Sequence, residues 1–468
     1  MSFLRLKYLS FFFLIISFFS FINILYSYYF NLYSNLNTYS FILFISTLVS
    51  FIFYKLKSSA QKPSIFEKLI TVFLGYILMP LILSLPFYFS IYNFTYLNAF
   101  FEAVSGFTST GFTIFENIEY IDEDLILWRS SIQWIGGLYF LNSVIFLIDI
   151  YDESFKKTLT NFISFDSSEV FKQAIKIFFL YSGLTLLIFI ILNIFNVRSF
   201  DSLNLAFSLI SSGGFIPAND LSLIIKENSQ VIILSFLMLF SFFSIFFIYN
   251  LLFFKKKNIN FFYEDLHLII YYIFIVAIFF LFFSFNTNFS LNLLALSSSI
   301  SNIGFTLETS QTNMSFVFLI LVIIGGSFFS TSSGLRFIKV YSLFKYSLNQ
   351  ILSFSKPKNV FMNKLIFTKI NFDFNEINKY FLTILIFVFS FFTLTSLLSL
   401  SGIEFEDSVK LSILTLMNTV NSSIYGIDVF SFENLSFFTK YCLILFMIVG
   451  RIELLTIMLI IKKFLFKN

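Results

Sequence analysis

Ten apolar runs of about twenty residues follow one another along the chain, and they constrain its fold more than any other feature. A helix needs roughly 20 apolar residues to cross the hydrocarbon core of a bilayer. Of the 468 residues, 58% are hydrophobic and 12% are charged, which a soluble domain could not accommodate. We therefore predict an all-α integral membrane protein. The predicted spans are 8–30, 38–56, 66–90, 124–150, 170–195, 229–254, 264–286, 314–345, 377–400 and 434–461.

The charged residues between these spans predict the orientation of the chain. Basic clusters fall on one side, which should be the cytoplasm. We expect both termini there, and no cleaved signal peptide because the first run is long. The basic positions are Arg5, Lys7, Lys55, Lys57, Lys62, Lys68, Lys156, Lys157, Lys172, Lys176, Lys255, Lys256, Lys257, Lys356, Lys358, Lys364, Lys369, Lys462, Lys463 and Lys467. The acidic positions opposite are Glu116, Glu119, Asp122, Glu123, Asp124, Glu404, Glu406, Asp407, Asp428 and Glu433.

Four outward connections, 94–115, 199–217, 288–307 and 406–426, begin with apolar stretches too short to cross a bilayer and end in small polar residues. Aligning Gly111, Gly213, Gly304 and Asn421 spaces them by 102, 91 and 117 residues. We predict four helix–pore-helix–helix repeats around a central pore, preceded by two extra transmembrane helices. The expected boundaries are 1–60 for these two helices, then 61–155, 156–258, 259–370 and 371–468 for the repeats, and the second helix of the third repeat is expected to be broken.

The end of each connection is interpreted as an extended turn that follows a re-entrant helix. Non-helical backbone survives at membrane depth only where it is buried in protein or lines water. Four such turns would form a ring of carbonyls that replaces a cation's hydration shell, with the pore-helix C-termini aimed at the cavity. The alternative is that small residues only permit close helix packing. The expected filter residues are Ser109, Thr110, Gly111, Ser211, Ser212, Gly213, Asn302, Ile303, Gly304, Thr419, Val420 and Asn421.

Several segments resemble the Trk/Ktr/HKT superfamily of cation transporters, and the two extra N-terminal helices resemble its TrkH branch. The similar segments are 101–111 (FEAVSGFTSTG), 128–137 (WRSSIQWIGG), 212–215 (SGGF), 325–327 (GGS), 330–336 (STSSGLR) and 447–453 (MIVGRIE). The resemblance implies potassium uptake across a bacterial inner membrane, with K⁺ held by the filter residues. It also implies a homodimer in contact with lipid, and a separate TrkA-like cytoplasmic ring that binds nucleotides. No cofactor is expected in this chain, which lacks a phosphate-binding glycine-rich loop, and no nucleic-acid partner is expected.

Charged residues that the sequence places inside the membrane are expected to have specific partners or functions. Arg336, with Gly325, Gly326 and Gly334, is interpreted as a gating loop on the inner path of the ion. The alternative is an arginine whose side chain reaches the membrane surface. Arg451 and Glu453 are expected to form structural ion pairs between repeats, the alternative being direct ion contact. For Glu102 we favour a carboxylate hydrogen-bonded behind the filter over one that binds the cation.

The fourth filter departs from the family pattern, because Asn421, Ser422 and Ser423 stand where Gly-Pro-Gly is usual. This predicts weaker discrimination of potassium from sodium, and a poorly selective transporter or channel is the first alternative function. Coupled and channel-like transport both remain open. A membrane-embedded transferase is the second alternative. It is disfavoured because an enzyme of this kind needs converging catalytic or metal-binding side chains, and the chain has one histidine, His267, and one cysteine, Cys442.

Overall fold

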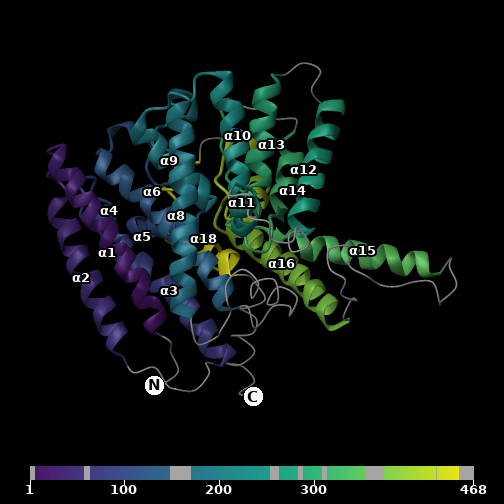
Figure 1. The fold of residues 1–468 in the computed structure, drawn as a ribbon, viewed down its shortest axis with the longest axis horizontal. Helices are drawn as coiled ribbons and strands as arrows, with labels where there is room; N and C mark the ends of the chain where they lie inside the picture. The colour runs from purple at the N-terminus through teal and green to yellow at the C-terminus, as the bar shows by residue number, and fades with distance from the viewer. Residues whose placement is uncertain are drawn as a thin grey trace.

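The computed structural model describes residues 6–56, 64–147, 170–252, 263–282, 288–307, 314–354, 374–427 and 430–452. These residues are predominantly helical, and the helices are joined by loops (Figure 1). Six helices among them are long and apolar enough to cross a membrane: α1 (Leu6–Tyr29), α2 (Leu36–Lys55), α3 (Ile65–Leu83) with α4 (Leu85–Tyr88), α8 (Val170–Ile194), α12 (Tyr263–Phe282) and α16 (Phe374–Leu400). They are the two N-terminal helices and the first helix of each predicted repeat.

The second helix of each predicted repeat is not among these six helices. The second helices are α6 (Glu123–Phe146), α10 (Asn228–Phe242) with α11 (Ile245–Leu252), α14 (Ser315–Ile323) with α15 (Phe337–Ser353), and α18 (Phe437–Ile452). Nearly every residue of α6 is buried, including Arg129 and Gln133. A helix enclosed by protein does not need an apolar surface, which explains why α6 can carry these polar and charged residues.

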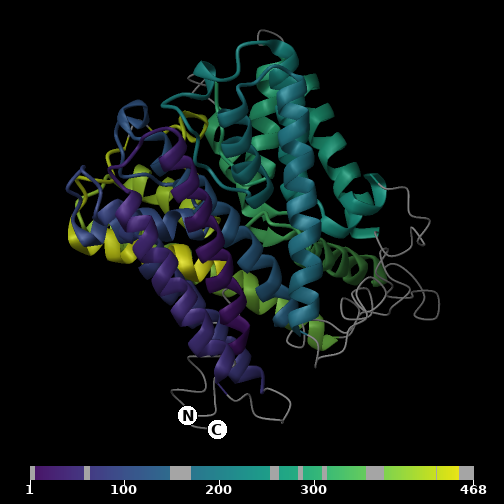
Figure 2. The ribbon, with the colours of Figure 1, turned by 60° about the vertical axis from the view of Figure 1, so that its left-hand side comes forward.

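The two N-terminal helices form a hairpin that packs on the first repeat (Figure 2). Serine hydroxyls join the helices at close range: Ser20 donates to the Tyr39 carbonyl at 2.6 Å and Ser50 to the Ser10 carbonyl at 2.8 Å. Such small polar residues hold helices together where no hydrophobic driving force exists. At the end of α1, the Tyr26 hydroxyl donates to Glu123 of α6 at 2.6 Å and fixes the hairpin to the repeat.

Four short helices occupy the predicted re-entrant connections: α5 (Tyr96–Phe107), α9 (Ser199–Ser211), α13 (Phe289–Ile300) and α17 (Phe405–Leu416). Their 12 or 13 residues span only about 18–20 Å at 1.5 Å per residue, too little to cross a bilayer. Three single turns of 3₁₀ helix lie in the loops that follow α5, α9 and α17: η1 (Ile118–Tyr120), η3 (Leu221–Leu223) and η6 (Ser423–Tyr425).

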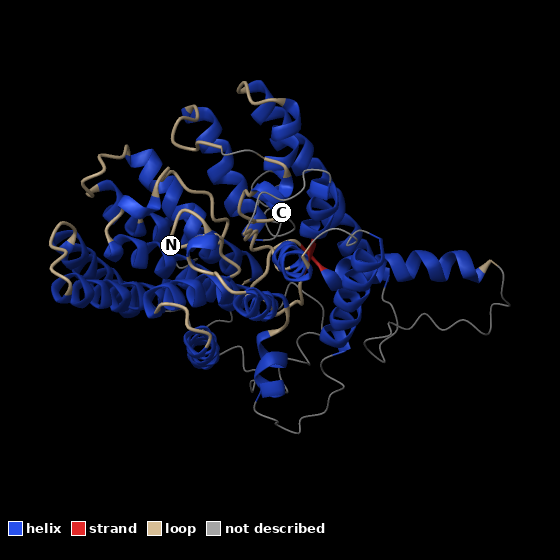
Figure 3. Cartoon of the chain, turned by 90° about the horizontal axis from the view of Figure 1, so that it is seen from above, coloured by secondary structure: helices blue, strands red, loops and turns tan. Residues whose placement is uncertain are grey.

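Two helices are interrupted at one level of the molecule. The predicted break in span 314–345 is present, and its ends form a short parallel pair, β1 (Ile324–Gly325) with β2 (Leu335–Arg336), drawn in red in Figure 3. The predicted single span 229–254 is wrong, because Phe243 and Ser244 separate α10 from α11. The loop between β1 and β2 docks on this second break: Ser327 N donates to the Phe242 carbonyl at 3.0 Å, and Ile245 N donates to the Phe329 carbonyl at 3.2 Å. Each interruption thus satisfies backbone groups of the other.

The orientation and the repeat boundaries stay predictions. Many of the residues behind them lie outside the described residues: Arg5, Lys57, Lys62, Lys156, Lys157, Lys255, Lys256, Lys257, Lys356, Lys358, Lys364, Lys369, Asp428, Glu453, Lys462, Lys463 and Lys467.

Candidate functional site

The four pore helices end in the same turn. One residue just after each helix has a left-handed backbone: Ser109 (φ 56°), Ser212 (φ 56°), Asn302 (φ 60°) and Asn418 (φ 47°). The next residue in each turn is Thr110, Gly213, Ile303 or Thr419. Its backbone amide donates to the carbonyl of the residue five positions earlier, at 2.7–3.0 Å. This is the hydrogen bond of a Schellman helix end, and it aligns the four turns residue for residue.

The observed alignment corrects the predicted one. The residue after the hydrogen-bonded amide is Gly111, Gly214, Gly304 and Val420 in the four turns. The alignment predicted from the sequence placed Gly213 and Asn421 at the position of Gly111 and Gly304. This alignment is wrong by one residue in the second and fourth turns. The error has a physical cause: the left-handed residue that sets the turn is a serine or asparagine, whereas the alignment was anchored on glycine.

Hydrogen bonds link the four turns in cyclic order, three of them directly and one through α6. Three links connect turn to turn, and Gln133 of α6 connects the first repeat to the second turn. Asn418 Nδ2 donates to Thr110 Oγ1 at 3.0 Å, Asn302 Nδ2 to Thr419 Oγ1 at 3.3 Å, Ser212 Oγ to the Ser301 carbonyl at 2.6 Å, and Phe215 N to Gln133 Oε1 at 3.4 Å. The order around the ring is therefore first, second, third, fourth, and the second turn lies diagonally across from the fourth.

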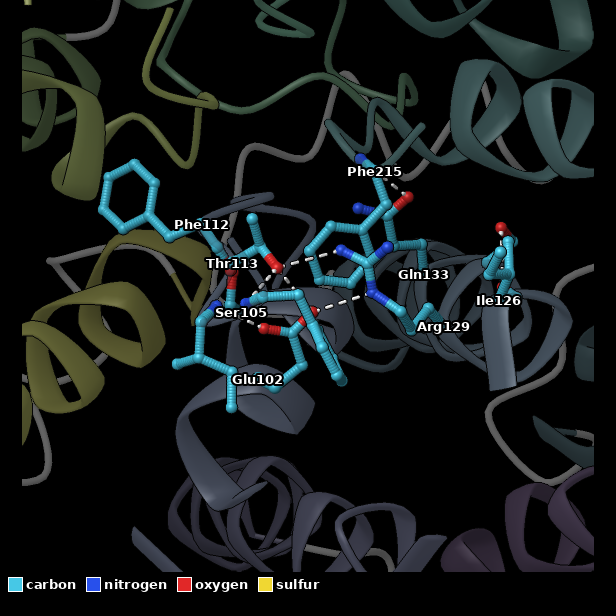
Figure 4. A network of polar contacts seen from close by, with 11 residues as sticks. Glu102, Ser105, Phe112, Thr113, Ile126, Arg129, Gln133 and Phe215 are labelled. Carbon is cyan, nitrogen blue, oxygen red and sulfur yellow. Dashed lines mark hydrogen bonds and ion pairs between the residues drawn. The ribbon is translucent and has the colours of Figure 1, made fainter. Parts of the chain in front are cut away.

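A buried ion pair supports the first turn from behind (Figure 4). Arg129 Nε donates to Glu102 Oε1 at 2.9 Å, and both side chains are at most 1% exposed. The other Glu102 oxygen accepts the Ile114 amide at 2.9 Å, while Arg129 donates to Thr113 Oγ1 at 3.0 Å. These bonds hold in place the irregular segment at Thr113 and Ile114 that follows the first turn. The Arg129 guanidinium also lies 4.3 Å from the Phe215 ring centroid, which connects this support to the second turn.

Arg451 of α18 lies where the pore helices end. Its guanidinium donates to Ser109 Oγ at 3.2 Å and to the Ser211 carbonyl at 3.4 Å, in the first and second turns. It also donates to the Ser333 hydroxyl of the loop between β1 and β2. Among the described residues these partners are uncharged, so the expected ion pair gives way to hydrogen bonds with filter and loop. Glu453 lies outside the described residues.

The loop 326–334 between β1 and β2 lies against the same end of the filter. Thr331 Oγ1 donates to the Ile210 carbonyl of the second pore helix at 2.7 Å. Arg336 turns back into the loop, and its Nη1 contacts the carbonyls of Ser327, Ser330 and Ser332 at 2.9, 3.4 and 3.2 Å. Arg336 is 2% exposed, which argues against the alternative of a side chain at the membrane surface.

Glycine is required where this loop folds onto itself. A Cβ on Gly334, whose φ is +81°, would lie 2.8 Å from Gly325 Cα, and one on Gly326 would lie 2.5 Å from Ser332 Oγ. The predicted gate residues are thus brought together in one packed loop. The gating role itself stays a prediction.

Sequence reasoning missed three residues of this site. Arg129 and Gln133 support the first and second turns from α6, and Asn418 joins the fourth turn to the first. The signal for Arg129 was present, because an arginine inside a predicted span needs a buried partner and Glu102 was available. No pattern marked Asn418, whose partner Thr110 lies 308 positions away.

The relatives found by sequence comparison are named as a cation transporter and as potassium uptake proteins. No family model matches the chain. The chain is 23% identical over 470 aligned positions to an uncharacterized cation transporter of Methanocaldococcus jannaschii, and the alignment covers 94% of this chain and 91% of that protein. It is 22% identical to the Trk system potassium uptake protein TrkG of Escherichia coli, covering 92% of each chain, and 23% identical to TrkH of that organism, covering 81% of each.

The fold is also that of a solved structure. The crystal structure of the potassium transporter TrkH from Vibrio parahaemolyticus superposes with a TM-score of 0.79 at 17% identity, covering 98% of this chain and 99% of that one. The resemblance to Trk-type potassium uptake proteins that the motifs indicate is thus confirmed over most of the chain, in sequence and in fold.

Proposed function

We propose that this protein takes up potassium ions through the ring of four turns, across a bacterial inner membrane. The observation that carries the proposal is the ring itself: four equivalent turns after four short helices, hydrogen-bonded in cyclic order. The names of the similar TrkG and TrkH proteins, which describe potassium uptake, support the choice of ion.

Carbonyl groups of the turns replace the hydration shell of the ion. In the corrected alignment, 109–111, 212–214, 302–304 and 418–420 form the filter, and the predicted residues Ser211 and Asn421 flank it. The C-terminal ends of α5, α9, α13 and α17 add their partial negative charge. The membrane potential drives the ion inward with about 2.3 kcal/mol per charge for each 100 mV.

The loop 326–334 and the two arginines close the inner end of this path. Arg451 contacts both the filter and the loop, and Arg336 holds the loop in its folded form through three of the loop's own carbonyls. Positive charge so close to the filter repels a cation and opposes its passage. Opening therefore requires the loop and Arg451 to move aside.

The wider assembly follows the resemblance. We infer a homodimer in the lipid membrane, with both termini and a TrkA-like nucleotide-binding ring on the cytoplasmic side, and repeats bounded at 61–155, 156–258, 259–370 and 371–468. Helix α15 supports contact with a second copy or with lipid. It extends away from the body in Figures 1 and 3, and it exposes 63% of Phe344 and 65% of Ile351.

Rescue of a potassium-uptake-deficient bacterium on low potassium tests the function. Expression of the wild-type chain should restore growth, and added sodium should not. Failure of rescue, with normal amounts of protein in the membrane, would refute potassium uptake. Rescue that sodium abolishes would favour the alternative of a poorly selective cation transporter.

A further inference from the structure

One position of the filter carries a branched apolar side chain where the three equivalent positions carry glycine. Val420 of the fourth turn aligns with Gly111, Gly214 and Gly304. The backbone permits this substitution. Gly111 (φ +83°) and Gly304 (φ +84°) are left-handed, whereas Gly214 and Val420 do not have a positive φ. Valine is therefore unstrained in the fourth turn, although it would be strained in the first or third.

The Val420 side chain reaches two other turns. A Cβ built on Gly304 would lie 2.5 Å from Val420 Cγ1, and one built on Gly214 would lie 3.0 Å from Val420 Cγ2 and 3.1 Å from Cγ1. The third turn is the neighbour of the fourth, but the second turn is diagonally opposite in the ring. A side chain that touches the diagonal turn extends across the axis. The methyl groups of Val420 therefore lie where a permeating cation has to pass.

Methyl groups offer a cation no ligand, and apolar constrictions close pores by excluding water. Valine also has few accessible χ1 rotamers, so it cannot leave the axis by small adjustments. We propose that Val420 is a side-chain constriction inside the filter, which must be displaced before an ion passes and which sets the rate of permeation. This inference rests on the proposed function, and it is independent of the inner loop and of both arginines.

Rubidium uptake into proteoliposomes tests the proposal with a graded series. Val420→Gly should raise the initial rate by about tenfold, equivalent to about 1.4 kcal/mol of barrier. Val420→Ala should give an intermediate rate, and Val420→Ile a rate below wild type. Val231→Ala, which shortens a buried valine of α10, is the matched control and should leave the rate unchanged. The melting temperature of each purified variant shows whether it folds, and Val420→Ala replaces Val420→Gly if the latter does not.

The outcomes separate this inference from the proposed function. A wild type that transports rubidium, with a Val420→Gly variant no faster, would overturn the constriction and leave potassium uptake standing. A wild type that transports no rubidium or sodium, with a Val420→Gly variant that does, would support the constriction and contradict uptake by the natural protein. Absence of transport in every variant would overturn both.

Discussion

Gly111 is the filter position at which a side chain is excluded most completely. Its φ of +83° is costly for any residue with a Cβ, and that Cβ would lie 2.7 Å from Gly214 Cα, a backbone atom that cannot swing away. The four left-handed residues Ser109, Ser212, Asn302 and Asn418 carry side chains because they point toward neighbouring turns or helices and form hydrogen bonds there.

Gly111→Ala should lower rubidium flux, and rubidium preference over sodium, more than it lowers the amount of protein in the membrane. The strain of about 1–3 kcal/mol falls on the carbonyls that bind the ion. Gly183→Ala is the matched control, since a Cβ there meets nothing within 4 Å. Paired rubidium and sodium uptake in proteoliposomes checks the prediction. Unchanged flux and preference in Gly111→Ala would count against the filter assignment.

Glu102→Ala should lower the thermal stability of the purified protein, by about 3–5 kcal/mol if Arg129 stays buried without its partner. The double variant Glu102→Ala/Arg129→Met should recover part of this loss, because it removes the uncompensated charge. Melting of the three proteins in detergent measures the effect. A single variant as stable as wild type, with altered ion affinity, would instead indicate that Glu102 binds the cation.

At the scale of elements, the loop 326–334 is positioned by groups from several helices. Thr331 contacts the end of α9, Ser327 contacts the end of α10, and Ser333 contacts Arg451 of α18. The loop can leave this position only if its bonds to α9, α10 and α18 break together, whereas the Arg336 contacts hold the loop's own folded shape. A gate requires two well-separated states, and the need to break several bonds at once would separate an open state from this one.

Arg336→Ala should raise the basal flux and weaken its dependence on a regulatory partner, because the loop loses three contacts with its own carbonyls. Lys345→Ala removes a positive charge from α15, the helix that follows Arg336, without changing a residue of the loop, and should leave basal flux near wild type. Rubidium uptake at equal protein content compares the two. A variant Arg336→Ala that conducts less than wild type would show that the loop holds the path open rather than closed.

Helix patterns predicted the elements well, but not the details of their contacts. The four short helices and the break near Gly325 and Gly334 follow from run length and glycine content. The break at Phe243 and Ser244 does not, because the surrounding sequence is uniformly apolar and the interruption depends on a loop some 80 residues away. The one-residue alignment error has the same origin. Turn geometry is set by Schellman bonds, and in these four turns serine or asparagine occupies the left-handed position that glycine usually takes.

In the molecule as a whole, two kinds of helix surround the ring of turns. The first helices of the repeats and the N-terminal pair are long and apolar, whereas α6 is buried and carries polar residues, and α10–α11 and α14–α15 are each interrupted. Composition predicts this division only in part, because α14 is strongly apolar and yet belongs to an interrupted helix. Closure of the ring links residues hundreds of positions apart, such as Asn418 and Thr110, and only the folded structure brings such residues together.

The central claim is that the ring conducts potassium, and rubidium uptake driven by a set membrane potential tests it most directly. Purified wild-type protein in liposomes, with the potential negative inside, should accumulate rubidium. External potassium should compete with this uptake far better than sodium at equal concentration. Reversing the potential should abolish it. Uptake no greater than in protein-free liposomes, or equal competition by potassium and sodium, would contradict the account.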